Sequence, residues 1–174
     1  MRIHYDLEFH DQGRDEPIRL ISIGMIREDG HKLYAVNADM DTNAVRADPW
    51  LRKNVWRHLP LTSVARGERG MPTLDRDDPD VRPLAQISEM VRRFVLSADN
   101  PELWAYYSSH DHVVMTSQLF GRMTDLPTGF PMRTNDLAQV LAKFPTYVMP
   151  TTYTPEHHAF ADARNLALAC SELL

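Results

Sequence analysis

The sequence lacks three features that would mark particular classes of protein. It has one cysteine, Cys170, in 174 residues, which rules out an internal disulfide and a zinc site built from several thiolates. No apolar run reaches the roughly 18 residues that a membrane-spanning helix needs, and charged residues interrupt the N-terminal stretch where a secretory signal would be apolar. We therefore expect a cytoplasmic protein without a membrane partner.

Positive charge is also in short supply. The chain has 19 Lys and Arg residues against 24 Asp and Glu, a formal net charge of -5. Proteins that coat nucleic acid neutralise phosphates with Lys and Arg, so this balance disfavours that class unless bound cations offset clustered acids. The balance reverses between Arg46 and Arg69, a stretch that includes Arg52 and Arg57. This stretch is either a solvated helix face with its loop or a phosphate-binding surface.

The length fits a single domain over residues 1–174. Alternating hydrophobicity and a turn signal at Asp29-Gly30 predict three consecutive strands with largely antiparallel connections. Helices and one further strand follow, so the predicted fold class is α/β, with a mixed central sheet that opens with three antiparallel strands and is flanked by helices. The expected strands are Arg2–Phe9, Pro17–Ile26, Leu33–Val36 and Leu103–Tyr107, and the expected helices are Asp41–Leu59, one that carries Leu84 to Val95, one from Ser108 or Ser109 to Phe120, Asn135–Phe144, and a last one opened by Thr154-Pro155-Glu156.

The first strand places two acidic residues on one face. From residue 2 to residue 9, apolar side chains alternate with His4, Asp6 and Glu8, and a strand sends alternate side chains to opposite faces. Carboxylates that neighbour each other on one face repel. The pattern indicates either an edge strand whose acidic face meets water or a site for a hard divalent cation with oxygen ligands.

A third acid borders a buried stripe near the C-terminus. Asp162 falls at the margin of the apolar face of the last helix, where an acid should be paired, protonated or bound to a metal. His157 and His158 precede it by about one turn. The stripe has spacings of four and three and consists of Ala159, Ala163, Leu166, Cys170 and Leu173.

These residues carry a resemblance to a known family. Asp6-Leu7-Glu8, Asp111 at the start of a mid-chain helix, and residues 157–163 resemble the three motifs of the DEDDh 3′–5′ exonucleases, and the last segment fits the pattern His-x-Ala-x-x-Asp-Ala in full. Within that family, the sequences at residues 5–9, 20–24 and 103–105 resemble the adenylate-preferring exoribonuclease AS group most closely. The motifs span nearly the whole chain. The resemblance implies a ribonuclease H-like fold.

The resemblance also implies hydrolysis of a phosphodiester with two metal ions. By this resemblance Asp6, Glu8 and Asp162 ligate one ion, Asp6 bridges to the second, and Asp111 supports the second ion. Two Mg²⁺ ions, or Mn²⁺, suit ligands that are all oxygen and stabilise both the attacking and the leaving oxygen. The implied catalytic residues are Asp6, Glu8, Asp111, His157 and Asp162.

The general base could be either of two adjacent histidines. Helix geometry favours His158, which lies four residues before the helix acid and shares its face. The family pattern favours His157, five residues before the acid, at an end where the helix can present it into the cleft, and we take His157 as the base on that ground. An imidazole with a pKa near neutral is a suitable proton acceptor. Asp111 has an alternative role, since an acid in the first turn of a helix is often only a favourable dipole partner.

Substrate contacts are expected close to these motifs. Aromatic side chains there could stack on or wedge the 3′-terminal base, although aromatic residues in strands belong mostly to the core. The candidates are Phe9, Met25, Trp104, Tyr106, Ser108, Arg52 and Arg57.

The sequence therefore predicts a metal-dependent 3′–5′ exoribonuclease that releases 5′-nucleoside monophosphates from a single-stranded 3′ end of RNA. An adenylate preference is implied by the resemblance alone, as is a homodimer in which the basic segment around Arg52 approaches RNA bound to the partner. Leu7 departs from the threonine of many relatives, which bears on substrate choice and not on catalysis. The alternatives are a proofreading-type 3′–5′ DNA exonuclease and a non-catalytic nucleic-acid-binding relative.

Overall fold

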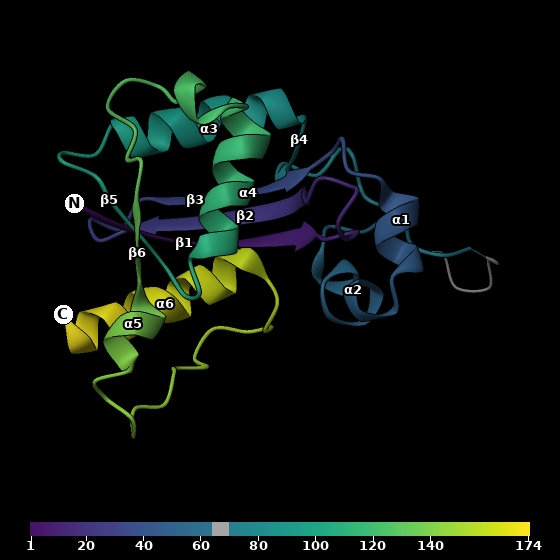
Figure 1. Cartoon of the computed structure of the whole chain (residues 1–174). Helices are drawn as coiled ribbons and strands as arrows, with labels where there is room; N and C mark the ends of the chain where they lie inside the picture. Colours follow the sequence, from purple (N-terminus) through teal and green to yellow (C-terminus); the bar gives the residue numbers. More distant parts are fainter. Residues whose placement is uncertain (64–69) are drawn as a thin grey trace.

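A six-stranded sheet forms the centre of the molecule. The structure is a computed structural model that describes residues 1–63 and 70–174. Among these residues the strands are ordered β4-β3-β2-β1-β5-β6, which places the first strand of the chain inside the sheet (Figure 1). The strands are β1 Arg2–His10, β2 Arg19–Arg27, β3 Lys32–Asn37, β4 Val81–Arg82, β5 Glu102–Ala105 and β6 Thr134–Asp136.

The first half of the sheet follows the order of the chain. β1 pairs antiparallel with β2, and β2 pairs antiparallel with β3. At the turn between β2 and β3, the N–H of Gly30 donates to the carbonyl oxygen of Arg27 at 2.9 Å. Gly30 has φ +90°, a conformation that glycine adopts at little cost. The three antiparallel strands and the Asp-Gly turn predicted from the sequence are confirmed.

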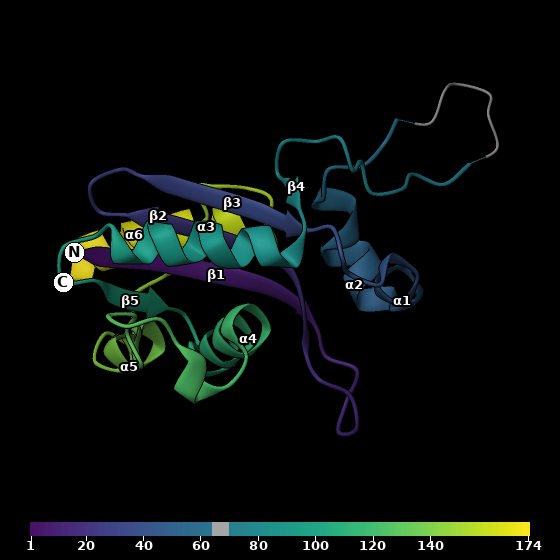
Figure 2. The same cartoon turned by 90° about the horizontal axis from the view of Figure 1, so that it is seen from above.

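Helices cover both faces of the sheet. α3 and α4 lie on one face, and α6 lies on the other, beneath β1 and β2 (Figures 1 and 2). The helices are α1 Thr42–Ala47, α2 Pro49–Asn54, α3 Leu84–Leu96, α4 Ser109–Phe120, α5 Leu137–Leu141 and α6 Ala159–Leu173, with short 3-10 turns η1 Trp56–His58 and η2 Met123–Asp125.

Alternation along β1 divides its side chains between these two layers. Ile3, Tyr5 and Leu7 are buried in the core that contains the apolar residues of α3 and α4. Because successive strand residues point to opposite faces, Asp6 and Glu8 face α6.

The remaining strands make the sheet mixed. β5 pairs parallel with β1, β6 pairs parallel with β5, and β4 pairs parallel with β3. This arrangement, with helices on both faces, confirms the predicted α/β class and is consistent with a ribonuclease H-like fold. None of the helices in the described part of the chain has the length and apolarity needed to cross a membrane.

The predicted continuous helix over Asp41–Leu59 is wrong, because the chain forms α1, α2 and η1 in succession. Proline disfavours helical backbone at the residue before it, and Asp48, which precedes Pro49, is extended at φ -69° and ψ 120°. The carboxylate of Asp48 then caps α2, since it accepts from the N–H groups of Trp50 and Leu51, both at 2.8 Å.

The last helix begins later than predicted. Thr154-Pro155-Glu156 is not its first turn, because α6 starts at Ala159 with His158 as its N-cap. The Nδ1 atom of His158 accepts from the N–H of Ala161 at 3.4 Å. His157 has φ +60°, which lies outside the right-handed helical region. His157 therefore stands on the connecting segment, immediately before the helix.

The chain between α4 and α6 also differs from prediction. The segment Asn135–Phe144 was expected to be one helix, but residues 134–136 form β6 and only Leu137–Leu141 are helical. Asp136 marks the change, because its side chain accepts from the N–H of Ala138 at 2.9 Å and caps α5.

Candidate active site

Two carboxylates of β1 form the floor of the candidate site. Asp6 lies opposite Gly24 of β2, and Glu8 lies opposite Ser22. The register between the strands shifts directly after Glu8, as happens at bulges, which are common beside active sites. At both acids the backbone of β1 pairs with β2, whereas the pairing of β1 with β5 ends at His4.

Gly24 allows α6 to approach this floor. A Cβ atom on Gly24 would lie 2.3 Å from the backbone nitrogen of Phe160 and 2.4 Å from the carbonyl carbon of Ala159, far inside the separation of non-bonded carbon atoms. Since Gly24 pairs with Asp6, the first turn of α6 packs next to Asp6. This close approach brings Asp162, three residues into the helix, to the acids of β1.

Asp111 reaches the site from the opposite layer. It lies in the first turn of α4, is only 7% exposed, and its Oδ1 atom accepts from the backbone N–H of Leu7 at 2.9 Å. Leu7 stands between Asp6 and Glu8 in β1, so this hydrogen bond holds the third carboxylate against the strand that carries the first two. The alternative role as a mere dipole partner does not account for this contact.

Asp162 and His157 close the site. One ligand atom from each of Glu8, His157 and Asp162 can be chosen so that all three lie within 4.8 Å of one another. Asp6, His157 and Asp162 also line one cavity of about 470 Å³. Asp162 therefore points towards the strand that bears Asp6 and Glu8. A site shared by these three acids requires this orientation.

Burial raises the pKa values of all four carboxylates, and the charges of neighbouring acids of the site add to the rise for Asp6 and Glu8. Burial, followed by the charges of Asp111, Glu8 and Asp162, raises the pKa of Asp6 well above its ordinary value. Burial and the charges of Asp162 and Asp111 raise the pKa of Glu8 to about 8. Burial also raises the pKa of Asp111 to about 7, despite the hydrogen bond from Leu7, and it raises that of Asp162.

No Lys or Arg side chain forms an ion pair with these acids within the described residues. The ion pairs formed there by Lys and Arg involve other carboxylates, and none reaches Asp6, Glu8, Asp111 or Asp162. Buried carboxylates that lie together without a partner are costly. Their oxygen atoms are the ligands that Mg²⁺ and Mn²⁺ prefer, so this donor set fits divalent cations.

The two adjacent histidines have different surroundings. His158 caps α6 and stacks on Tyr34, with ring centroids 4.6 Å apart, and burial lowers its pKa. His157 lines the cavity with Asp6 and Asp162. Its ring meets that of Trp50 edge-on at 4.8 Å. The helical register that favoured His158 does not apply, because His158 is the N-cap and His157 is outside the helix.

The predicted substrate contacts outside the basic stretch lie in four different places. Tyr106 lines the acidic cavity, and Phe9 lines a smaller depression of about 230 Å³. Trp104 and Ser108 line a separate groove that contains none of the four acids. Met25 is fully buried, because it pairs with Tyr5 and points into the core between the sheet and α3 and α4; the structure does not bring it to the site.

The predicted basic surface is only partly described. Arg52 on α2 and Arg57 on η1 are exposed to solvent. Arg66 and Arg69, which contributed to the positive balance of that stretch, lie outside the described residues. The structure thus leaves Arg52 and Arg57 as the basic candidates that can be located.

Trp50 is a candidate that the sequence reasoning missed. In the predicted helix over Asp41–Leu59 it would be one of the apolar positions, but its side chain is 51% exposed. It touches the ring of His157 and shares the depression that Phe9 lines. The signal available in the sequence was a tryptophan close to the basic residues Arg52 and Lys53, because aromatic and basic side chains together are typical of platforms for nucleic-acid bases.

Comparison with known proteins assigns the family. Two curated proteins named 3′–5′ exoribonuclease, from Mycobacterium tuberculosis strains CDC 1551 / Oshkosh and ATCC 25618 / H37Rv, are each 35% identical to this chain over 165 residues. The aligned region covers 95% of this chain and 88% of each relative. No protein-family model matches the chain. With this identity over nearly its whole length, the chain belongs to the family of 3′–5′ exoribonucleases.

Proposed function

We propose that the protein is a metal-dependent exoribonuclease of the DEDDh group that removes 5′-nucleoside monophosphates from a single-stranded 3′ end of RNA. One observation carries the proposal. Four acids and a histidine from β1, α4, α6 and the segment before α6 meet around one site, although Asp111, His157 and Asp162 all lie more than 100 residues after the acids of β1. The names of the two relatives support the direction of cleavage and the class of substrate.

The carboxylates are proposed to hold two divalent ions. Asp6, Glu8 and Asp162 would ligate the first ion, Asp6 would also contact the second, and Asp111 would support the second ion directly or through water. When bound, the pair of ions would stabilise negative charge on the attacking and leaving oxygens and would offset the repulsion among the acids. Mg²⁺ is the expected ion, and Mn²⁺ fits the same ligands.

His157 is proposed as the general base. It lines the cavity with Asp6 and Asp162, so it can take a proton from a water molecule that attacks the terminal phosphodiester. As the water oxygen bonds to phosphorus, the bond between phosphorus and the 3′-oxygen of the preceding nucleotide breaks. A 5′-monophosphate is released, and the leaving 3′-oxygen takes up a proton from solvent to become a new 3′-hydroxyl. His158 is occupied as the cap of α6 and as the partner of Tyr34.

Tyr106 on one side and Phe9 with Trp50 on the other are proposed to contact the terminal nucleotide. Tyr106 lines the cavity of Asp6 and Asp162, and Trp50 touches the ring of His157 and shares a depression with Phe9. Aromatic faces stack on bases without requiring one sequence. The resemblance to the exoribonuclease AS group adds a preference for adenylate. A homodimer is proposed on the same ground, with the basic residues Arg52 and Arg57 of one protomer near RNA bound by its partner.

The test is degradation of labelled RNA homopolymers with single-stranded 3′ ends, alongside DNA of matched sequence. We expect monophosphate release from RNA with Mg²⁺, fastest on polyadenylate, and loss of release with EDTA or in Asp6→Ala. Equal cleavage of DNA would favour a proofreading-type DNA exonuclease, because selection for RNA rests on the 2′-hydroxyl. Absence of cleavage with every divalent ion would favour a non-catalytic binding protein.

A further inference from the structure

The segment before α6 needs an anchor if it is to present His157. Between residues 149 and 157 it has no helix or strand, yet Met149, Thr151, Tyr153 and His157 all line the acidic cavity. His157 itself makes an edge contact with the exposed ring of Trp50. The end of the segment is also held by Asp162, whose Oδ2 atom accepts from the backbone N–H of His158 at 3.2 Å. These contacts leave open what fixes the backbone further back, around Tyr153.

Asn165 of α6 supplies a specific anchor. Its Oδ1 atom accepts from the backbone N–H of Tyr153 at 2.9 Å, and its Nδ2 atom donates to the carbonyl oxygen of the same residue at 2.9 Å. Asn165 is 7% exposed. A buried amide whose two ends both hold one backbone unit fixes the position and the orientation of that unit.

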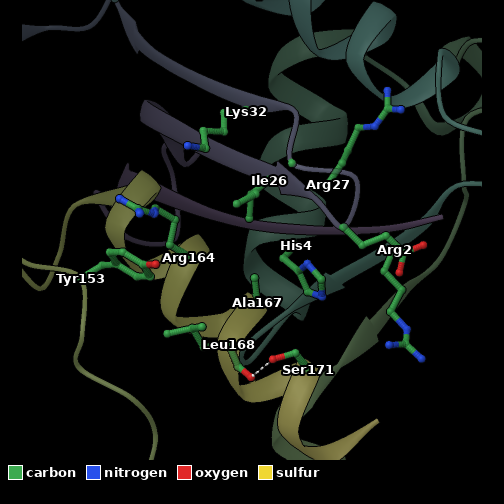
Figure 3. Close-up of a pocket in the computed structure, with 12 residues that line it drawn as sticks. Arg2, His4, Ile26, Arg27, Lys32, Tyr153, Arg164, Ala167, Leu168 and Ser171 are labelled. Atoms are coloured by element: carbon green, nitrogen blue, oxygen red, sulfur yellow. Dashed lines mark hydrogen bonds between the residues drawn. The ribbon is translucent and has the colours of Figure 1, made fainter.

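The neighbouring residue of α6 holds the side chain of Tyr153. The guanidinium carbon of Arg164 lies 3.4 Å from the centre of the Tyr153 ring, and the two groups lie against each other in Figure 3. This is a close cation–π contact. Two successive residues of one helix therefore hold Tyr153, one through hydrogen bonds to its backbone and the other through contact with its ring.

The anchor links the two parts of the site that must move together. Asn165 lies three residues after Asp162 on α6, about one helical turn away, and Tyr153 lies four residues before His157. The helix that carries the acid thus also holds the segment that carries the histidine. A shift of the segment would change the distance between His157 and the water it has to deprotonate.

We infer that Asn165 is a positioning residue that fixes His157 for catalysis through Tyr153. The inference rests on the proposed role of His157 as the general base. Because a displacement of about 1 Å can lower a rate by about 100-fold, Asn165→Ala should lower kcat by about 10- to 100-fold while KM changes by less than about threefold. Asn165→Leu, which keeps the buried volume without the hydrogen bonds, should lower kcat to a similar degree.

Asn37 provides a matched control. It is also buried, and its amide also spans two backbone groups, donating to the carbonyl of Leu20 and accepting from the N–H of Asp39, both at 2.9 Å. It does not border the acidic cavity. Asn37→Ala should lower Tm about as much as Asn165→Ala and leave kcat unchanged when all variants are assayed well below their Tm.

The decisive experiment is a double-mutant cycle of Asn165→Ala and His157→Ala on labelled RNA, with kcat, KM and Tm measured for each variant. The inference predicts that Asn165→Ala lowers kcat in the wild-type background and has no further effect in His157→Ala. Equal losses in both backgrounds, or a loss no larger than that of Asn37→Ala, would overturn it while His157 stays the base. Full activity of His157→Ala alone would instead remove the proposed base, and with it this inference.

Discussion

The substitution Gly24→Ala tests how closely α6 must approach the acids of β1. The added Cβ would lie 2.3 Å from the backbone nitrogen of Phe160 and 2.4 Å from the carbonyl carbon of Ala159. Both are backbone atoms, so no rotamer change can relieve the clash. To restore ordinary contact, the start of α6 must move outward by about 1 Å.

That movement carries Asp162 away from Asp6 and Glu8. We expect the overpacked interface to destabilise the fold by about 1–3 kcal/mol, which corresponds to a fall in Tm of about 2–12 °C for a chain of this size. Because a misplacement of about 1 Å costs about 100-fold in rate, kcat on RNA should fall by about that factor. Calorimetry and a steady-state assay with Mg²⁺ measure the two effects.

A second variant separates the loss of stability from the loss of geometry. Ile87→Ala removes a fully buried side chain of α3, on the other face of the sheet, and should destabilise by about 2–5 kcal/mol with kcat unchanged below its Tm. If Gly24→Ala kept the kcat and Tm of the wild type, the close approach of α6 would not position the site, and the reasoning would be refuted.

Three further predictions follow from the surroundings of single residues. His157→Ala should lose at least about 100-fold in kcat. His158→Ala should retain catalysis but have a lower Tm, because the helix cap is lost. The reverse result in the RNA assay would assign the base to His158. In the folded protein the pKa of Glu8 is raised to about 8 and that of Asp111 to about 7, so the unfolded chain gives up these protons at lower pH. The metal-free protein should therefore lose stability as pH rises from about 4 to 8 and regain it with Mg²⁺. Calorimetry at several pH values checks this, and a flat metal-free profile would contradict it. Asp111→Asn retains an oxygen for the N–H of Leu7 and should lose activity with little change in Tm. Asp111→Ala leaves that buried N–H without its partner and should also lower the free energy of unfolding by about 1–3 kcal/mol. Equal Tm values for the two variants would count against the hydrogen bond.

The sequence was most informative where one local rule decided the outcome. Alternation along β1 placed Asp6 and Glu8 on one face, and the structure puts them there. The same rule applied to β2 would have excluded Met25, because it alternates with Gly24 and therefore points to the core. The family motif selected Asp111 and Asp162, whose meeting with β1 depends on packing between distant elements.

Features set by tertiary contacts were beyond prediction from the sequence. The start of α6 depends on His158 as a cap and on the left-handed backbone of His157, and neither produces a periodic pattern. The hydrogen bonds between Asn165 and the backbone of Tyr153 join a helix to an irregular segment, so no local sequence pattern indicates them. The exposure of Trp50 follows from a helix that ends and restarts at Pro49.

The central claim is that four distant acids hold two divalent ions beside His157. Crystals grown with Mn²⁺ and 5′-AMP test it most directly, because manganese can be located by its anomalous scattering. The account predicts one ion bound by Asp6, Glu8 and Asp162 and a second that also contacts Asp6, with His157 facing the phosphate. No anomalous signal between β1 and α6, or ions held by other residues, would contradict it.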